Sequence, residues 1–576
     1  MVKEPCNIDT ARHSNKTMIF DLERKSNPIL QYTKTRGLRL ILIFFIFLLF
    51  ASCSVKVSHE ELNKVLIPWP NEVVWGNDAF YPGEALSIQV TGARLEEIAD
   101  HFAIEVSPYL GITKVGKGVQ GDLALKLDPL TDLPKEGYRL EITADGIHIT
   151  ATGQEGIYYG LNSLKQLIRF NYNKDEAWAI PTGTIRDAPR FSWRGVMLDE
   201  SRHFFGMEQV KQLLDLMAEH KLNKFHWHLT DEPAWRIEIK AYPRLTEIGS
   251  RGDWSNSSQE AKFYTQEQVR EIVQYAAQRQ IEIIPEIDMP GHASAANRAY
   301  PEFSGGGNPE HPGFTFNPGK EGTYAYLTTI LEEVAALFPS EYIHLGGDEV
   351  HFANQQWLQD PGVRSLMERE GFENLKEVEH YFLRRMSDAL RAMGKKTAGW
   401  DEIASAGLDH HESMISWWRH DKPGVLHDAL DRGYKTVLCP RIPLYFDFIQ
   451  HPTHQYGRTW KGFGDTMGVY HFPDSAWSGL GGKELVMGIQ SCIWTERIAT
   501  KERLDFMTWP RLTAMSEAAW TQPEAKSYER FLERLPHFYV FYDKLQIAYF
   551  DLFDPESTPE PVWNDGPNWQ QNHNTE

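Results

Sequence analysis

Long apolar segments, basic charge and cysteine are all scarce in this chain of 576 residues. The apolar run at residues 40–51 is too short for a membrane-spanning helix, which needs about 20 residues. The formal net charge of -20 argues against a nucleic-acid partner, which requires a basic surface. Four scattered cysteines exclude a disulfide framework and a cysteine zinc site, and no motif requires a metal or an organic cofactor.

The short apolar run nevertheless predicts export. Lys34, Arg36 and Arg39 precede it, and a basic flank before a short apolar core is typical of a secretory signal. The run ends at Ala51-Ser52-Cys53, which resembles a bacterial lipobox. We therefore expect residues 1–53 to be a leader and Cys53 to be acylated, giving a membrane-anchored lipoprotein in the periplasm or at the cell surface of a bacterium. A plain signal peptide or an uncleaved anchor is the alternative.

Two structural regions follow the leader. Residues 54–188 contain short β-like segments such as LSIQV and YRLEIT and a helical stretch that reaches Ile168, which predicts a small α+β domain. Ala188-Pro189 then breaks the chain. Residues 526–576 are expected to form a C-terminal helix and a weakly ordered tail.

Between these regions, residues 189–525 alternate apolar, β-branched runs with amphipathic helical stretches. This rhythm predicts an α/β fold, specifically a (β/α)8 TIM barrel, although periodicity alone also allows an open doubly wound sheet. The eight expected strands are GVMLD (195–199), KFHWHL (224–229), IEIIPEID (281–288), YIHLGG (342–347), KTAGW (396–400), SMISW (413–417), KTVLC (435–439) and MGIQSCIW (487–494).

Polar and aromatic residues cluster at the ends of these runs, where a barrel places its active site. Arg194 and Asp199 bracket the first run, and candidate residues follow the other seven: Asp231, Asp288, His292, Asp348, Glu349, Trp400, Trp417, Trp418, Tyr445, Asp447, Trp494 and Glu496. Asp401-Glu402 are interpreted as charges at a helix N-terminus and stay outside the site. A ring of such residues from all eight strands predicts a pocket.

Asp348 and Glu349 are the strongest catalytic candidates, because two glycines precede them in HLGGDE and allow a sharp turn beside a ligand. Glycoside hydrolysis needs a proton donor at the leaving oxygen and a group that stabilises positive charge at the anomeric carbon. Two neighbouring carboxylates can divide these roles, since the charge of one raises the pKa of the other and burial raises it further.

Together these motifs resemble the β-N-acetylhexosaminidases of glycoside hydrolase family 20. HLGGDE, HWHLTD (226–231) and PEIDMPGH (285–292) carry the likeness, and GIYYGLNSLKQLI resembles the small N-terminal domain of these enzymes. The resemblance implies exo-acting release of terminal N-acetylglucosamine or N-acetylgalactosamine from glycans. It also implies a retaining mechanism in which the substrate's own 2-acetamido oxygen, and no protein nucleophile, attacks the anomeric carbon.

The resemblance also implies roles for particular residues. Glu349 would be the general acid and then base, Asp348 would orient the acetamido nitrogen, and Tyr445 would hold the acetamido oxygen. Arg194 would bind the 3- and 4-hydroxyls, and Asp231 and His292 would form a relay behind Glu349. The remaining substrate-binding candidates are Trp400, Trp417, Trp494, Asp447 and Glu496.

Some segments depart from the family's pattern. DEPAWR (231–236) replaces a more typical DDQGWR, and SWWRH (416–420) makes Trp418 an alternative to Trp417, which we choose because Ser-Trp aligns directly. Two other functions stay open: a barrel glycosidase with a conventional nucleophile and acid, and a glycan-binding lipoprotein that has lost activity. The second is disfavoured because Asp348, Glu349 and Tyr445 are all present.

Overall fold

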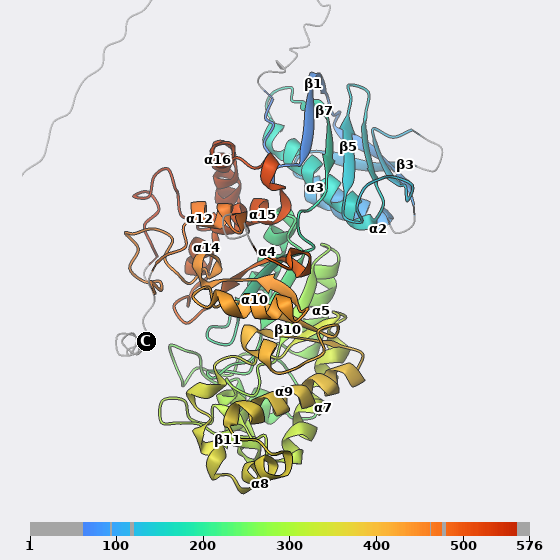
Figure 1. Ribbon diagram of the computed structural model, residues 1–576. Helices are drawn as coiled ribbons and strands as arrows, with labels where there is room; N and C mark the ends of the chain where they lie inside the picture. Colours follow the sequence, from blue (N-terminus) through green and yellow to red (C-terminus); the bar gives the residue numbers. More distant parts are fainter. Residues whose placement is uncertain (1–61, 93–94, 116–119, 461, 475–479, 562–576) are drawn as a thin grey trace, which may run out of the picture. The chain divides into compact units, whose positions relative to one another are not determined.

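The computed structural model describes residues 62–92, 95–115, 120–460, 462–474 and 480–561 (Figure 1). The leader, with its apolar run and Cys53, lies outside the described residues, as does the end of the C-terminal tail. None of the helices in these ranges is long and apolar enough to cross a membrane.

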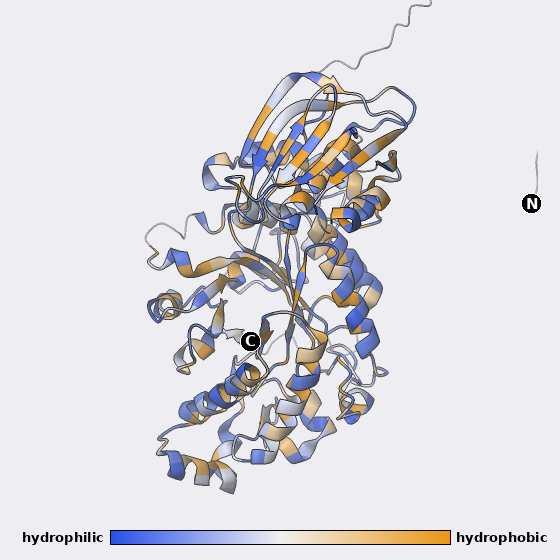
Figure 2. Cartoon of the chain, turned by 90° about the vertical axis from the view of Figure 1, so that its right-hand side faces the viewer, coloured by the Kyte–Doolittle hydropathy of each residue, from blue (hydrophilic) through white to orange (hydrophobic). Residues whose placement is uncertain are grey.

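The N-terminal part is a seven-stranded mixed sheet in the order β1-β7-β5-β6-β4-β2-β3. Helices α2 (Leu95–Val106) and α3 (Gln154–Asn171) pack against it and against each other (Figure 1). Buried and more exposed residues alternate along β5 and β6, as expected for strands with one face in the core. Figure 2 shows hydrophobic and hydrophilic segments alternating along the strands of this sheet. The strands are β1 (Glu72–Phe80), β2 (Ala85–Thr91), β3 (Gly111–Val115), β4 (Leu123–Leu127), β5 (Tyr138–Ile142), β6 (Ile147–Ala151) and β7 (Ile180–Asp187).

Eight parallel strands then close into a barrel in the order β10-β13-β14-β15-β16-β17-β8-β9. The predicted (β/α)8 fold and the small α+β domain before it are confirmed. The barrel strands are β8 (Trp193–Asp199), β9 (Lys224–His228), β10 (Glu282–Glu286), β13 (Tyr342–His344), β14 (Lys396–Trp400), β15 (Ser413–Trp417), β16 (Lys435–Leu438) and β17 (Val486–Ile493). All seven residues of β8 are buried, because a barrel strand faces packed side chains on one side and helices on the other.

Helices connect the strands on the outside of the barrel. The principal ones are α4 (Met207–Glu219), α5 (Gln266–Ala277), α7 (Glu321–Leu337), α9 (Leu375–Ala392), α10 (Pro423–Asp431), α12 (Thr466–His471), α14 (Lys501–Thr508) and α15 (Arg511–Trp520). α5 begins with a capping box, in which Thr265 and Gln268 each bond the other's backbone N–H. Helix α16 (Tyr528–Lys544) is the expected C-terminal helix.

The structure contradicts the predicted role of Arg194. It lies at the amino end of β8 and is fully buried, away from the edge where the strands end. Its guanidinium donates to both carboxylate oxygens of Glu136 (3.1 and 2.9 Å), to the hydroxyl of Tyr159 (2.9 Å) and to the backbone oxygens of Lys221 and Phe191. Arg194 therefore joins the N-terminal domain to the amino-terminal end of the barrel and does not line the site.

Candidate active site

The carboxyl ends of the barrel strands bring together polar residues that lie up to 300 positions apart in the chain. Asp348 and Glu349 follow β13 through a turn in which Gly346, Gly347 and Glu349 all have positive φ (66°, 87° and 53°). A Cβ at Gly346 would lie 1.8 Å from Oδ1 of Asp288, so only glycine fits there. Glu349 keeps a left-handed backbone without being glycine, which is a strain typical of functional positions.

A chain of ion pairs leads from this turn into the barrel. Nε2 of His292 lies 3.5 Å from Oδ2 of Asp348 and 3.7 Å from Oε2 of Glu349. Nδ1 of the same imidazole is 3.0 Å from Oδ1 of Asp231. Asp231 and His292 thus lie behind the acidic pair in the arrangement expected of a relay.

The acidic pair differs in exposure. The side chain of Glu349 is 30% exposed, whereas that of Asp348 is 12% exposed. Burial raises the pKa of Asp348 to about 7, His292 opposes this rise, and the neighbouring Glu349 carboxylate adds to it. The Asp348 carboxyl group therefore keeps its proton up to about that pH.

Four aromatic rings stand beside the acidic pair. The rings of Trp400 and Trp494 are 5.7 Å apart, those of Trp494 and Tyr445 are 6.0 Å apart, and Trp418 stacks on Tyr445 at 6.4 Å and 11°. Burial raises the pKa of the Tyr445 phenol well above its usual value, and Asp348 contributes to this. Tyr445 is therefore a hydrogen-bond donor at any working pH.

Trp417, which we chose over its neighbour, is not part of this wall. Its side chain is buried in the main hydrophobic core, whereas Trp418 packs with Met197, Trp400 and Tyr445. Nε1 of Trp418 donates to Glu402 (3.1 Å), so a residue left outside the predicted site supports the wall. The prediction of Trp417 is corrected to Trp418, because the side chains of adjacent strand residues point to opposite faces.

A cluster of charged side chains lies at another part of the carboxyl-terminal edge of the barrel. Nη2 of Arg202 pairs with Asp231 (2.8 Å), and Arg458 bridges Asp447 (3.0 Å) and Glu496 (3.0 Å). Burial raises the pKa of Asp447 to about 7. Burial acts in the same direction on Glu496, but Arg202 and Arg458 outweigh it and keep its pKa below the usual value.

Sequence reasoning missed Arg202 and Arg458, and it weighed Trp418 but chose Trp417. Arg202 comes three residues after the end of β8, so the rule that active-site residues follow their strands would have favoured it over Arg194. Trp418 likewise follows its strand. Arg458 lies twenty residues beyond the end of β16 and carried no comparable signal.

Several buried polar atoms of the candidate active site lack a protein hydrogen-bond partner within the described ranges. They are Oδ1 of Asp348, Oδ1 of Asp447, Oε2 of Glu496 and Nε1 of Trp494. Buried polar atoms normally have partners, and hydroxyl and amide groups of a bound sugar are suitable ones.

Imidazole and carboxylate groups also cluster closely enough to hold a cation, for example His228, Asp231 and Asp288. The facing atoms, however, are imidazole nitrogens opposite carboxylate oxygens, such as Nε2 of His228 and Oδ2 of Asp231 at 2.9 Å. Donors matched to acceptors make hydrogen-bonded ion pairs and need no ion between them.

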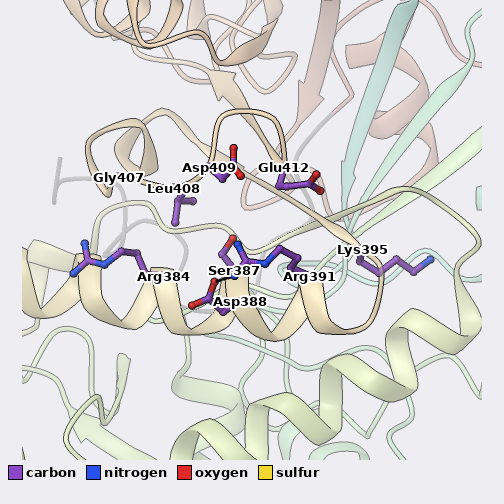
Figure 3. Close-up of a pocket in the computed structure, with 9 residues that line it drawn as sticks. All are labelled: Arg384, Ser387, Asp388, Arg391, Lys395, Gly407, Leu408, Asp409 and Glu412. Atoms are coloured by element: carbon purple, nitrogen blue, oxygen red, sulfur yellow. Dashed lines mark hydrogen bonds and ion pairs between the residues drawn. The ribbon is translucent and has the colours of Figure 1, made fainter.

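A hollow of about 290 Å³ lies elsewhere, between α9 and the segment that leads into β15 (Figure 3). Arg384, Asp388, Arg391 and Glu412 line it, near the amino ends of the barrel strands. It therefore belongs to the opposite side of the barrel from the acidic pair.

A carboxyl group with a raised pKa beside aromatic rings that suit a sugar face is the chemistry of a glycoside hydrolase. Residues 191–523 match the family model "Glycosyl hydrolase family 20, catalytic domain", and residues 63–188 match "Glycosyl hydrolase family 20, domain 2". The chain belongs to glycosyl hydrolase family 20.

Individual proteins that are similar to this chain support the family assignment. The chain is 33% identical to a β-hexosaminidase of Porphyromonas gingivalis over 86% of its own length and 66% of the relative's, so it spans just under two thirds of that protein. It is also 33% identical to one of Vibrio furnissii, over 78% and 76%. Among solved structures, the exo-β-N-acetylglucosaminidase of Vibrio harveyi in complex with N-acetylglucosamine is similar (TM-score 0.78, 32% identity, 84% of this chain and 78% of that one). So is the β-N-acetylhexosaminidase of Bacteroides fragilis (TM-score 0.78, 29% identity, 87% and 100%).

The adjacent tryptophans make a matched test of the site. Trp417→Ala removes a core side chain, so we expect about 3–5 kcal/mol less stability and little change in kcat per folded molecule. Trp418→Ala removes part of the pocket wall, so we expect kcat/KM to fall about tenfold or more with a smaller loss of stability. Urea unfolding and aryl-glycoside hydrolysis measure the two effects. A larger loss of kcat/KM in the Trp417 variant would contradict the assignment.

The raised pKa of Asp348 predicts a pH dependence. Because that pKa is about 7, Asp348 is protonated below this pH and becomes a carboxylate as the pH rises through it. The role that the resemblance implies for Asp348 needs the carboxylate as an acceptor, so we expect kcat/KM, which reports the free enzyme, to fall on the acidic side with a midpoint near pH 7. Asp348→Asn cannot ionise, so its residual activity should lack this acidic limb. An acidic limb at the same pH in both proteins would contradict the assignment to Asp348.

Proposed function

We propose that this glycoside hydrolase is an exo-acting β-N-acetylhexosaminidase that releases terminal β-linked N-acetylglucosamine or N-acetylgalactosamine from glycans. The observation that carries the proposal is the aromatic wall of Trp400, Trp418, Tyr445 and Trp494 beside Asp348 and Glu349. Such a wall suits an acetamido group and a sugar ring. The β-hexosaminidase names of the relatives support the same activity.

The reaction would use the substrate's own acetamido group. The acetamido oxygen attacks the anomeric carbon as the glycosidic bond breaks, and Glu349 gives its proton to the leaving oxygen. Because the acetamido nitrogen keeps its proton, this forms a positively charged oxazolinium intermediate and leaves Glu349 as a carboxylate. Glu349 then takes a proton from the water that attacks the anomeric carbon, which opens the oxazolinium ring and restores the acetamido group with retention at the anomeric carbon.

Two residues would assist the attack. Asp348 accepts a hydrogen bond from the acetamido N–H and stabilises the positive charge that develops there. The Tyr445 hydroxyl, which stays protonated, donates to the acetamido oxygen. The Asp348 contact strengthens as positive charge develops, so it lowers the barrier more than it favours substrate binding, whereas the Tyr445 contact orients the acetamido oxygen for attack.

The cluster of charged side chains would hold the sugar hydroxyls. Arg202 takes the role first expected of Arg194, because it follows the carboxyl end of β8 and its guanidinium pairs with Asp231. Asp447 and Glu496 offer carboxylate oxygens without a protein partner among the described residues. Recognition of several hydroxyls of one ring favours removal of a single terminal sugar.

The activity is tested with p-nitrophenyl N-acetyl-β-glucosaminide beside the matching β-glucoside. We expect only the N-acetyl substrate to be cleaved, because the glucoside lacks the internal nucleophile. Glu349→Gln removes the proton donor and should lower kcat by about 10²- to 10⁴-fold.

The other outcomes identify the competing functions. Equal cleavage of both substrates would contradict the acetamido mechanism and favour a conventional protein nucleophile. Cleavage of neither, with tight binding of an N-acetylhexosamine glycan, would favour a binding lipoprotein.

We further propose that the enzyme is exported and anchored to a membrane by a lipid on Cys53. The basic flank, the short apolar run and Ala51-Ser52-Cys53 support this. An anchored glycosidase suits a glycan substrate outside the cytoplasm.

Expression of the full chain in a bacterium tests the anchor. We expect the wild-type protein in the membrane fraction with a labelled fatty acid attached. Cys53→Ser should carry no label and leave that fraction, since one short apolar run is too short to span the bilayer. Equal membrane retention of the variant would indicate an uncleaved anchor.

A further inference from the structure

The mechanism above assigns no role to Glu286, the last residue of β10. Its side chain is fully buried in the interior of the barrel. An isolated buried carboxylate would be very costly, so its partners are informative. Those partners come from three other barrel strands, β9, β13 and β14.

The two carboxylate oxygens of Glu286 face different parts of the active site. Oε1 accepts a hydrogen bond from Nε1 of Trp400 (2.9 Å), the tryptophan of the pocket wall, and lies 3.0 Å from Nδ1 of His344. Oε2 is paired with Nδ1 of His228 (2.6 Å) and Nε2 of His226 (2.8 Å). Burial by itself would raise the pKa of Glu286, but the three imidazoles outweigh it and hold the pKa well below its usual range.

His228 connects Glu286 to the residues that lie behind Glu349. Its Nδ1 faces Glu286 and its Nε2 faces Oδ2 of Asp231 at 2.9 Å, so each ring nitrogen is opposite a carboxylate. Burial lowers the pKa of His228, but Glu286 and Asp231 outweigh it and raise the pKa well above the usual value. The imidazolium therefore links Glu286 to Asp231, which holds His292 behind Asp348 and Glu349.

We propose that Glu286 is a positioning residue that holds two parts of the active site in place together. One of its oxygens fixes Trp400 of the aromatic wall, and the other fixes His228, which supports the Asp231–His292 relay behind Glu349. The proposal rests on the proposed function and deepens it. Glu286 does not touch the substrate. It fixes two groups that act on opposite sides of the anomeric carbon, so that the acetamido nucleophile and the proton donor are aligned at the same time.

A carboxylate is needed for this role because it offers two acceptor oxygens. The amide of glutamine has the same shape but only one acceptor oxygen, so it cannot accept from both Trp400 and a doubly protonated His228. Either the contact with Trp400 or the contact with His228 must then be lost or displaced. Small displacements of this kind can change rates by about 10²-fold.

The test is Glu286→Gln, with one measurement for the contact with His228 (the acid arm) and one for the contact with Trp400 (the wall arm). The acid arm is read from a series of aryl N-acetyl-β-glucosaminides, because a dinitrophenyl leaving group needs little protonation and a phenyl group needs much. The wall arm is read from the inhibition constant of a thiazoline analogue of the oxazolinium intermediate. We expect the phenyl substrate to lose about 100-fold in kcat/KM and the dinitrophenyl substrate about tenfold, with inhibition about tenfold weaker.

A purely structural role would lower the rates of all leaving groups by one factor and leave the inhibition constant unchanged. That result, or a change in only one of the two measurements, would overturn the proposal. Glu219→Gln is the matched control, because Glu219 is a buried carboxylate paired with Arg169 (2.5 Å) at the end of α4. It should lower stability without altering either measurement.

Two variants keep the test decisive where Glu286→Gln does not fold. Trp400→Phe keeps an aromatic ring but removes the pyrrole part of the indole with its Nε1 donor, so it should weaken inhibition and leave the leaving-group dependence unchanged. His228→Gln removes the imidazolium, so it should steepen the leaving-group dependence and leave inhibition unchanged. The reverse pattern would overturn the proposal. A wild-type enzyme that is insensitive to the thiazoline would instead contradict the proposed function.

Discussion

A line of buried and oppositely charged side chains runs from Glu286 through His228, Asp231 and His292 to Asp348 and Glu349. Each charge in the line would be very costly if buried alone, and each is stabilised by its neighbours. Arg202 joins the line at Asp231. The pKa of Asp348 and the position of Trp400 in the pocket wall both depend on this arrangement.

The turn after β13 adds a steric constraint to the electrostatic one. Gly346 lies against Asp288 and Gly347 lies against Ile403, so the backbone passes between packed side chains before it reaches the acidic pair. Glu349 is thereby held in a left-handed conformation. A side chain that is fixed by its backbone loses little entropy when it meets a ligand.

The N-terminal sheet contributes to stability from the other side of the barrel. Arg194, which is buried, pairs with Glu136 and Tyr159 of the N-terminal part, and Lys221 pairs with Asp187 at the end of β7 (3.3 Å). Truncating one partner of such a buried pair leaves an uncompensated charge, which typically costs about 3–5 kcal/mol. Arg194 and Arg202 lie eight positions apart yet serve different purposes, one structural and one at the site.

The amino-acid sequence by itself determined the barrel, the eight strands to within a few residues, and the family, because periodic burial and local motifs such as HLGGDE are properties of neighbouring residues. It also pointed to Asp348 and Glu349 as candidates, since glycines before an acidic pair are a local signal. Only the tertiary structure removed Arg194 from the site, brought Arg202 to it, and decided between Trp417 and Trp418. The direction in which a strand residue points, and the end of the barrel at which it lies, depend on packing against residues far away in the chain. The same holds for Glu286, whose partners come from three other strands.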